Sequence, residues 1–418
     1  MSALVLAIQL ASVAQQGQAL VERARDSVFT VEVHSGSSDA RDVLGSGYLV
    51  SDTGLVVTNY HVVGSYIDDP KRYQLRVRNG QGVHAARLLR FDLINDLALL
   101  EIAPIAVRPL TLAQRDPERG SSIVSLGNPE GLGLSLIEGV FNGYAEKGFV
   151  DRQLLSMPLN SGMSGGPIMN RAGEVIGTNV SVIWRANSLS FGVPVAKVKA
   201  LLAAPSVSTD AASLRADVSR QLAALEHETR ARVVEKLSHG DAVATVAVGE
   251  LSLRRPPALF DCWNTSHVYE DEGVTKRHYG CNLQFTPRVE KIGEVGSVEL
   301  GIEELTSRGN AYGFYGALGT QAEHSHRIKA QEPNNGILSA PHCEVERIRT
   351  RYMAFKVNTC LSAYVKHPGL FNGELIATTV SRPRHGAVLT LRASGITLDS
   401  FLALTRGVLG DVRWGDGQ

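Results

Sequence analysis

Between Gly17 and about Leu202 the sequence is a succession of short apolar runs, each closed by a turn residue. The runs are rich in Val, Leu and Ile and are bounded by Gly, Asn, Asp or Pro, which is typical of short β-strands. They read SVFTVEVHS, GSGYLVS, GLVVTNYHVV, YQLRVRN, LALLEIA, SSIVSLG, RQLLSMPL, EVIGTNVSVI and LSFGVPV. Regular short strands of this kind predict an antiparallel barrel or sandwich.

The pattern changes after residue 202. A segment that reads LLAAPSVSTDAAS has the composition of a linker, and the segment after it predicts a helix, with Ser213 as N-cap and Gly240 as its stop. An apolar stripe at helical spacing supports that helix: Leu214, Val218, Leu222, Leu225, Val233 and Leu237. We expect a connecting helix packed on a domain, because the heptad is too short and imperfect for self-association.

The region from 241 to 418 mixes both kinds of pattern. DAVATVAVGELSL, GSVELGIEEL, RYMAFKVN, GELIATTVS and AVLTLRAS predict strands, TLDSFLALTRGVL predicts a helix, and VSRPRHGAVLT predicts a hairpin loop. The region is therefore α+β. Five of its aromatic residues either line a groove or, as we favour, belong to the core: Trp263, Tyr279, Tyr312, Phe314 and Tyr315.

A chain of 418 residues exceeds what one hydrophobic core usually holds, so we expect two domains. The boundaries place an N-terminal segment at 1–16, a β domain at 17–202, a linker and helix at 203–240 and the α+β domain at 241–418. Lys plus Arg and Asp plus Glu both number 42, so no basic excess favours a nucleic-acid partner.

The N-terminal segment is apolar from Ala3 to Ala14 except for Gln9 and Ser12. It is too short to span a bilayer as a helix, and no other stretch is long and apolar enough. Small residues before Gln15 resemble a signal-peptide cleavage site, but no Lys or Arg precedes the run. A cleaved signal peptide and an amphipathic first helix both stay open, and we favour export to the periplasm or secretion over a cytoplasmic location.

The four cysteines all lie in the C-terminal region, at Cys262, Cys281, Cys343 and Cys360. An even number confined to one region predicts two disulfides and an oxidising compartment. Three pairings are open, of which the local one, 262 with 281 and 343 with 360, is the simplest. A zinc site with neighbouring histidines is less well supported, because no C-x-x-C pair is present; buried thiols stay open for a cytosolic protein.

The stretch LNSGMSGGPIMN places Ser164 in a G-x-S-x-G pattern. An α/β-hydrolase elbow must lead into a helix, with the Asp and His after the Ser. Here Pro167 and a turn at 171–173 lead into a predicted strand, so we exclude that reading. A serine hydroxyl needs a base, and the base needs a carboxylate to hold its tautomer.

His61, in GLVVTNYHVVG, and Asp96, in FDLINDLALLEIA, supply such a base and acid. The order His61, Asp96, Ser164 is that of the chymotrypsin fold. Five ordered blocks then make the resemblance specific: GSGYLVSDTGLVVTNYHVV, NDLALLEI, IVSLGNPEGLG, NSGMSGGPIMNRAGEVIGTN and LSFGVPVAKVKALL. Over roughly residues 17–202 the sequence resembles the HtrA/Deg-like branch of the chymotrypsin-fold serine proteases.

The resemblance implies that His61 is the general base, that Asp96 orients it and that Ser164 is the nucleophile. It implies an oxyanion hole made by the backbone N–H groups of Gly162 and Ser164. Met163 departs from the family, which usually has Asn there. A Met cannot brace the loop by hydrogen bonding, so either packing holds the loop or it rearranges when substrate binds.

The family's spacing places Pro158 at the base of the primary substrate pocket. The pocket wall would come from Leu189, Ser190, Phe191 and Gly192. Because no acid lies at the base, we expect a small or medium apolar side chain rather than Lys or Arg. A second departure is that no PDZ-like carboxylate-binding loop follows Gly240, so family expectations about PDZ domains do not transfer.

The sequence thus predicts an all-β double antiparallel barrel of the chymotrypsin type, followed by a helix and an α+β domain. The resemblance implies a serine endopeptidase that cleaves protein or peptide substrates through an acyl-enzyme with no metal or organic cofactor. An oligomer stays open. The alternative is a latent protease core that acts as a protein-binding or chaperone-like module.

Overall fold

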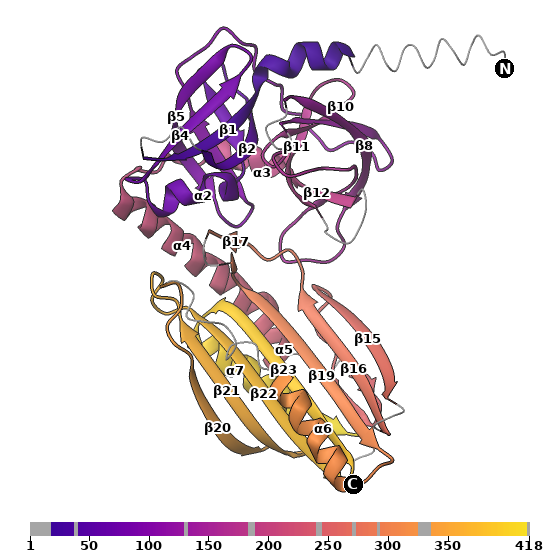
Figure 1. The fold of residues 1–418 in the computed structure, drawn as a ribbon. Coiled ribbons are helices and arrows are strands. Elements are labelled where there is room, and N and C mark those ends of the chain that lie inside the picture. The colour runs from indigo at the N-terminus through magenta and orange to yellow at the C-terminus, as the bar shows by residue number, and fades with distance from the viewer. Residues whose placement is uncertain are drawn as a thin grey trace, which may run out of the picture. The chain divides into compact units, whose positions relative to one another are not determined.

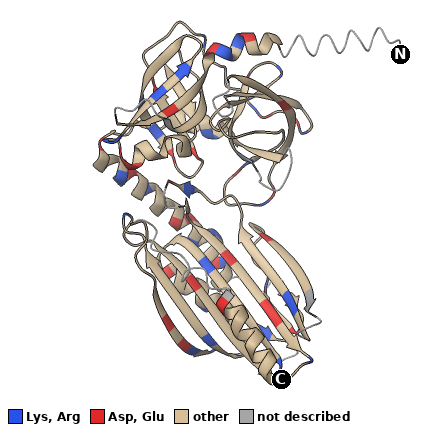
Figure 2. Cartoon of the chain, in the orientation of Figure 1, with Lys and Arg blue, Asp and Glu red and all other residues tan. Residues whose placement is uncertain are grey.

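The computed structural model describes residues 18–36, 41–128, 133–182, 189–239, 245–269, 273–290, 293–324 and 336–415. The expectation about residues 1–16 lies outside these ranges. No helix in the described part of the chain is long and apolar enough to cross a membrane. The chain divides into two compact units, and acidic and basic residues are interspersed along both (Figure 2).

The first unit contains two closed antiparallel barrels of six strands each (Figure 1), as the sequence predicts. The first barrel follows the order β1-β2-β3-β6-β5-β4. Its strands are β1 (Val28–Ser35), β2 (Arg41–Leu49), β3 (Leu55–Thr58), β4 (Tyr73–Asn79), β5 (Gly82–Asp92) and β6 (Leu97–Glu101). Its centre is aliphatic: Val31 and Val33 of β1, Val57 of β3 and Leu99 of β6 are fully buried there.

The second barrel follows the order β10-β11-β12-β9-β8-β7. Its strands are β7 (Ser122–Gly127), β8 (Ser135–Tyr144), β9 (Gln153–Ser156), β10 (Pro167–Asn170), β11 (Val175–Val182) and β12 (Leu189–Pro194). One cluster fills it: Ala113, Ile123, Phe141, Leu155, Met157, Leu159, Met163, Ile168 and Ile176. Helix α2 (Tyr60–Asp68) follows β3, and α3 (Val195–Ala203) closes the unit.

The connecting helix is present, but its start differs from the prediction. Helix α4 (Ala211–Thr229) begins before Ser213, because the Asp210 carboxylate accepts the backbone N–H groups of Ala212 and Ser213. Asp210 is therefore the cap that the sequence analysis assigned to Ser213. A π-helical turn η3 (Arg230–Val234) and α5 (Glu235–His239) continue it, and Gly240 lies outside the described residues. The division between the two units falls inside α4, after Gln221.

The second unit is built on a seven-stranded antiparallel sheet in the order β15-β16-β19-β23-β22-β21-β20. The strands are β15 (Phe260–Tyr269), β16 (Val274–Leu283), β19 (Ser297–Ser307), β20 (His342–Arg349), β21 (Ala354–Ala363), β22 (Phe371–Arg382) and β23 (His385–Ile396). A small sheet holds β13 (Thr245–Val248), β14 (Leu251–Arg254) and β24 (Arg413–Trp414). The predicted C-terminal helix is α7 (Leu398–Asp411), capped by the Thr397 side chain.

Helix α6 (Ala311–His324) packs on this sheet and was missed by the sequence analysis. Three glycines, at 313, 316 and 319, lower its helix propensity. Phe314 and Leu318 of this helix enter the core, in a cluster with Leu305, Ile376 and Val388. The expectation of core aromatics holds for Phe314 and Tyr279. It is wrong for three others, which are exposed: Trp263 (42%), Tyr312 (91%) and Tyr315 (51%).

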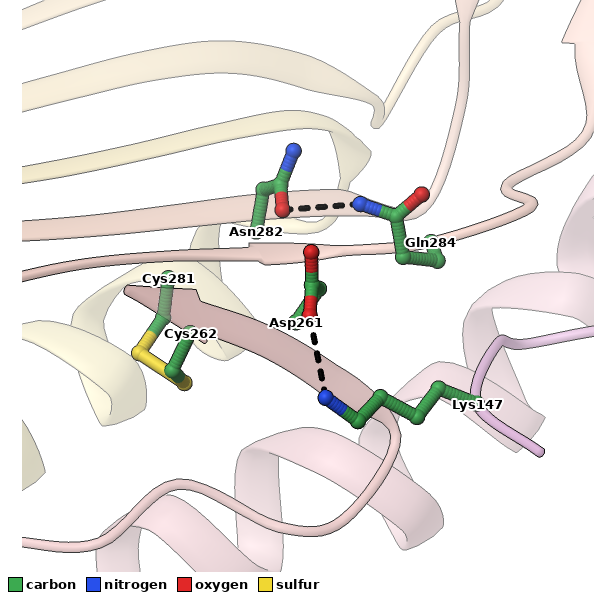
Figure 3. The surroundings of a disulfide bond; sticks show 6 residues. All are labelled: Lys147, Asp261, Cys262, Cys281, Asn282 and Gln284. Carbon is green, nitrogen blue, oxygen red and sulfur yellow. Dashed lines mark hydrogen bonds and ion pairs between the residues drawn. A yellow bond between two sulfur atoms is a disulfide. The ribbon is translucent and has the colours of Figure 1, made fainter. Parts of the chain in front are cut away.

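Two disulfides join neighbouring strands of the sheet, with the local pairing that we judged simplest. Cys262 of β15 bonds to Cys281 of β16, and Cys343 of β20 bonds to Cys360 of β21. Each pair sits at directly opposite positions of its strand pair. Beside the first disulfide, Lys147 pairs with Asp261 at 2.9 Å (Figure 3). The zinc alternative is wrong, because all four sulfurs are in disulfides.

Replacing Cys262 and Cys281 together by Ser should lower the free energy of unfolding by about 3 kcal/mol, the usual effect for a loop of this length. The bond closes a sequence separation of 19 residues, and Cys343–Cys360 closes 17. Urea titration followed by tryptophan fluorescence measures the loss. The double Ser variant of the second pair is the matched comparison, and equal stability of both variants and the parent would contradict the prediction.

Candidate active site

His61 lies in the first turn of α2, directly after β3. The run predicted as one strand through this residue ends at Thr58, because the buried Thr58 and Asn59 turn the chain. Thr58 Oγ1 donates to the Ser46 carbonyl at 2.7 Å, and Asn59 Nδ2 donates to the Asp96 carbonyl at 2.7 Å. These bonds present the His61 imidazole at the end of the strand with 37% of its surface exposed.

Asp96 sits in the turn between β5 and β6 with a left-handed backbone, φ 62°. Its carboxylate makes two bonds to the same residue. Oδ1 accepts the backbone N–H of His61 at 2.9 Å, and Oδ2 lies 2.7 Å from Nδ1 of the imidazole. Because a carboxylate only accepts, Nδ1 carries the proton and Nε2 keeps a free lone pair.

The charge of Asp96 also controls the protonation of His61. Burial of the imidazole acts to lower its pKa, but the charge and the hydrogen bond of Asp96 outweigh that effect. The pKa of His61 therefore lies above the ordinary value for histidine. A base with a raised pKa is neutral, and able to accept a proton, only above that pKa, so activity that depends on it falls as the pH drops.

Ser164 lies in the loop between β9 and β10, which glycines allow to bend sharply. Gly162 and Gly165 have φ of 88° and 86°, where a side chain is strained. A Cβ on Gly165 would also collide with the Ser46 carbonyl and the Thr58 hydroxyl. The loop is held to the first barrel by Ser46, whose N–H donates to the Ser164 carbonyl at 2.8 Å and whose Oγ donates to the Gly162 carbonyl at 2.7 Å.

The structure brings the backbone of Ser164 close to the helix of His61. Gly45 contacts both of them. A Cβ added to Gly45 would lie 2.6 Å from the side chain of Val62, the residue after His61, and 3.2 Å from the Ser164 carbonyl. The Ser164 hydroxyl itself is half-buried and donates to the Val180 carbonyl at 3.4 Å. Within the described residues, the N–H groups of Gly162 and Ser164 have no acceptor, so both are available to a ligand oxygen.

Met163 holds the loop by packing, the first of the two alternatives that the sequence left open. Its side chain is 1% exposed and belongs to the core of the second barrel. A Cβ on Gly127 would lie 3.0 Å from its sulfur, so the Met163 side chain needs a glycine at this position of β7. The Met163 carbonyl accepts the N–H of Gly166 at 3.0 Å, which closes the turn around Ser164.

Replacing Met163 by Ala should lower the free energy of unfolding by about 2–5 kcal/mol, because it leaves a cavity in the barrel. It should also slow labelling of Ser164 by a fluorophosphonate, because the loop loses its anchor. Met169→Ala is the matched control, since Met169 is equally buried but lies on β10. Equal labelling rates in the two variants at equal stability would argue against an anchoring role.

The residues expected to form the substrate pocket lie on β12 and just after β9, the strand with which β12 pairs. Leu189 pairs with Ser156 of β9, and Pro158 follows two residues later. Ser190, Phe191 and Gly192 are buried, Leu189 is half-buried and Pro158 is exposed. Their part in a pocket stays a prediction.

Two supporting residues were missed from the sequence: Ser46 and Asn179. Asn179 donates from Nδ2 to the Met163 carbonyl at 3.3 Å, and its backbone carbonyl accepts the Gly165 N–H at 3.0 Å. Thr58 and Asn59 were expected from the sequence to fix the turn before His61, and both do so. Among the described residues, no group of three or more His, Cys, Asp or Glu side chains could hold a metal ion.

Two six-stranded barrels, a His–Asp pair and a glycine-rich serine loop define a trypsin-like peptidase domain of the chymotrypsin type. Residues 45–177 match the family model described as "Trypsin-like peptidase domain". Within that class the region is HtrA/Deg-like. It is 31% identical over 199 residues to serine protease HTR4 of Rattus norvegicus, covering 44% of this chain and 39% of that protein.

A second relative is the Chlamydia trachomatis protein named "Probable periplasmic serine endoprotease DegP-like", 30% identical over 169 residues, with 38% of this chain and 33% of that protein covered. The chain thus spans well under half the length of these relatives. The crystal structure of the serine endoprotease from Yersinia pestis aligns with 28% identity and a TM-score of 0.39, covering 44% of this chain and 65% of that chain.

Proposed function

We propose that the protein is a serine endopeptidase with His61, Asp96 and Ser164 as its catalytic triad. The observation that carries the proposal is the pair of hydrogen bonds between one carboxylate and His61, at 2.9 and 2.7 Å. Beside it lies a serine loop in which, among the described residues, the N–H groups of Gly162 and Ser164 have no acceptor. The relatives named as serine proteases support the same activity.

In the proposed reaction, Ser164 Oγ attacks the scissile carbonyl while Nε2 of His61 takes the hydroxyl proton. Asp96 stabilises the imidazolium that forms and holds Nδ1 protonated. The tetrahedral oxyanion would accept hydrogen bonds from the N–H groups of Gly162 and Ser164. His61 then gives the proton to the leaving amine. In the second half of the reaction, water attacks the acyl-enzyme while His61 takes its proton, and His61 returns a proton to Ser164 Oγ as the second product leaves.

We propose protein or peptide substrates with a small or medium apolar residue before the cleaved bond, since Pro158 offers no charge to a basic side chain. Export fits the two disulfides, which persist in oxidising compartments, and a relative named as periplasmic. The protease region at 17–202 would act on substrate, whereas the region at 241–418 would recognise substrate, regulate access or mediate assembly.

A fluorophosphonate probe followed by peptide mapping tests the activation of Ser164 without knowledge of the substrate. We expect one labelled peptide, containing Ser164, and hydrolysis of a peptide library with the same pH dependence as labelling. Labelling at another serine, or none while the chain remains folded, would count against the proposal.

The alternative, a latent core that binds proteins, is favoured by one observation. The Ser164 hydroxyl donates to the Val180 carbonyl rather than to the imidazole. Bonds between nucleophile and base are often long without substrate and tighten in the complex, so we place this candidate second. Capture of unfolded casein without cleavage or labelling would favour it.

A further inference from the structure

The first unit contains, besides its two barrels, four residues from much later in the chain, Pro287–Glu290. The short strand β17 (Arg288–Val289) in this segment packs against α2, the helix that carries His61. The segment alternates in burial: Pro287 and Val289 are buried, Arg288 is exposed and Glu290 is half-buried. A segment of the C-terminal region is thus part of the surroundings of the base.

Glu290 makes the closest contacts with α2. Its Oε1 accepts a hydrogen bond from Ser65 Oγ at 3.3 Å. The three atoms nearest to a Cβ added to Gly64 would all belong to Glu290, with its Cβ at 2.9 Å and its Oε2 at 3.4 Å. A glycine within a helix costs about 1 kcal/mol relative to Ala, and the close approach of Glu290 is a physical reason for Gly64.

Two successive turns of α2 are thereby held by different acids. Asn59, at the N-cap position, makes no side-chain cap bond, and the Asp96 carboxylate takes the His61 N–H in its place. One turn later Glu290 holds Ser65. Burial raises the pKa of the Tyr60 phenol, and a hydrogen bond with the Glu290 backbone opposes that rise. Tyr60 and Ser65, which lie on either side of His61 in the sequence, therefore both form hydrogen bonds with Glu290.

We propose that Glu290 is a positioning residue for the general base: its contacts with Gly64 and Ser65 fix α2, the helix that carries His61. This inference rests on the proposed function. Three charged groups bear on His61 from the elements packed around it, namely Asp96, Glu290 and Arg288. The carboxylate of Glu290 acts to raise the pKa of His61, and the guanidinium of Arg288 acts to lower it.

The first test is the titration of His61 by NMR in the full-length chain with labelled histidine, assigned by the signal that is lost in His61→Gln. Glu290→Gln removes the charge and keeps the shape. It should lower the pKa of His61, because the carboxylate charge that acts to raise this pKa is lost. Glu290→Asp keeps the charge and should leave the pKa near that of the parent. Glu101→Gln, an exposed acid paired with Arg87, is the control.

The second test is the pH profile of kcat/KM for a cleaved peptide. The acid limb of Glu290→Gln should move to lower pH by the same amount, because the base then loses its proton more readily. Gly64→Ala improves helix propensity yet displaces Glu290, so it should lower the plateau of kcat/KM about tenfold, the scale of a small misplacement of a catalytic group.

The titration separates failure of this inference from failure of the proposed function. If the parent cleaves and labels nothing, the proposed function is wrong, but the pKa of His61 in Glu290→Gln can still be measured. If that pKa equals the parent value while the chain stays folded, Glu290 does not position the base. If Gly64→Ala leaves both the pKa and the plateau unchanged, the contact with α2 has no part in catalysis.

Discussion

Replacing Ser164 by Ala is expected to reduce peptide hydrolysis by roughly 10⁶-fold, the scale seen when a serine protease loses its nucleophile. The side chain contributes one long bond, to the Val180 carbonyl at 3.4 Å, whereas the loop is held through its backbone. Ser46 N–H donates to the Ser164 carbonyl and Ser46 Oγ donates to the Gly162 carbonyl, and both bonds persist in the variant. The loss should therefore be chemical and not structural.

The measurement is hydrolysis of a peptide identified from a library, together with urea titration of the same preparations. Ser161→Ala is the matched control, because Ser161 is an exposed serine in the same loop. It should retain parental activity, and both variants should unfold within about 0.5 kcal/mol of the parent. Hydrolysis by Ser164→Ala at more than a few per cent of the parental rate would remove Ser164 from the role of nucleophile.

The sequence predicted most barrel strands because their apolar residues are continuous or alternate clearly. It missed β5, β8 and β10, although all three strands complete closed barrels. Arg, His, Glu and Gly interrupt the pattern in β5 and β8, and β10 is only four residues long. In a closed barrel each strand pairs with a neighbour on both sides, as β1 pairs with β4. This pairing stabilises strands whose local composition does not identify them. The α+β character of the last region was predictable, but its strand order depends on the long-range pairing of β19 with β23.

The members of the proposed triad could be named from the sequence because each sits in a local motif. Its supports were not, since they come from distant positions: Ser46 lies 116 residues from Gly162, and Glu290 lies 225 residues from Ser65. A single serine or glutamate in a turn has no pattern that distinguishes it from other surface residues. Only the closed barrels and the segment at 287–290 bring these side chains to the site.

Asp96 provides a stringent test because its backbone geometry tolerates Asn. Its φ of 62° lies in the left-handed region, where Asp and Asn are the side chains most readily accepted. In Asp96→Asn the amide oxygen can still accept the His61 N–H now bound at 2.9 Å. The amide nitrogen then faces Nδ1 as a donor. The imidazole must present a lone pair there and carry its proton on Nε2, the atom that should receive the proton of Ser164.

We therefore expect Asp96→Asn to lower kcat by about 10⁴-fold with little change in stability, the effect known for this substitution in a catalytic triad. The pKa of His61 should fall at the same time, because the variant loses the charge that raises it. Kinetics with the library-derived peptide, NMR of the His61 ring nitrogens and urea titration measure the three quantities. The neighbouring Asp92→Asn, whose carboxylate caps Asn95 and not His61, is the control. A folded Asp96→Asn variant with near-parental kcat would show that His61 needs no orienting carboxylate, and the triad would have to be abandoned.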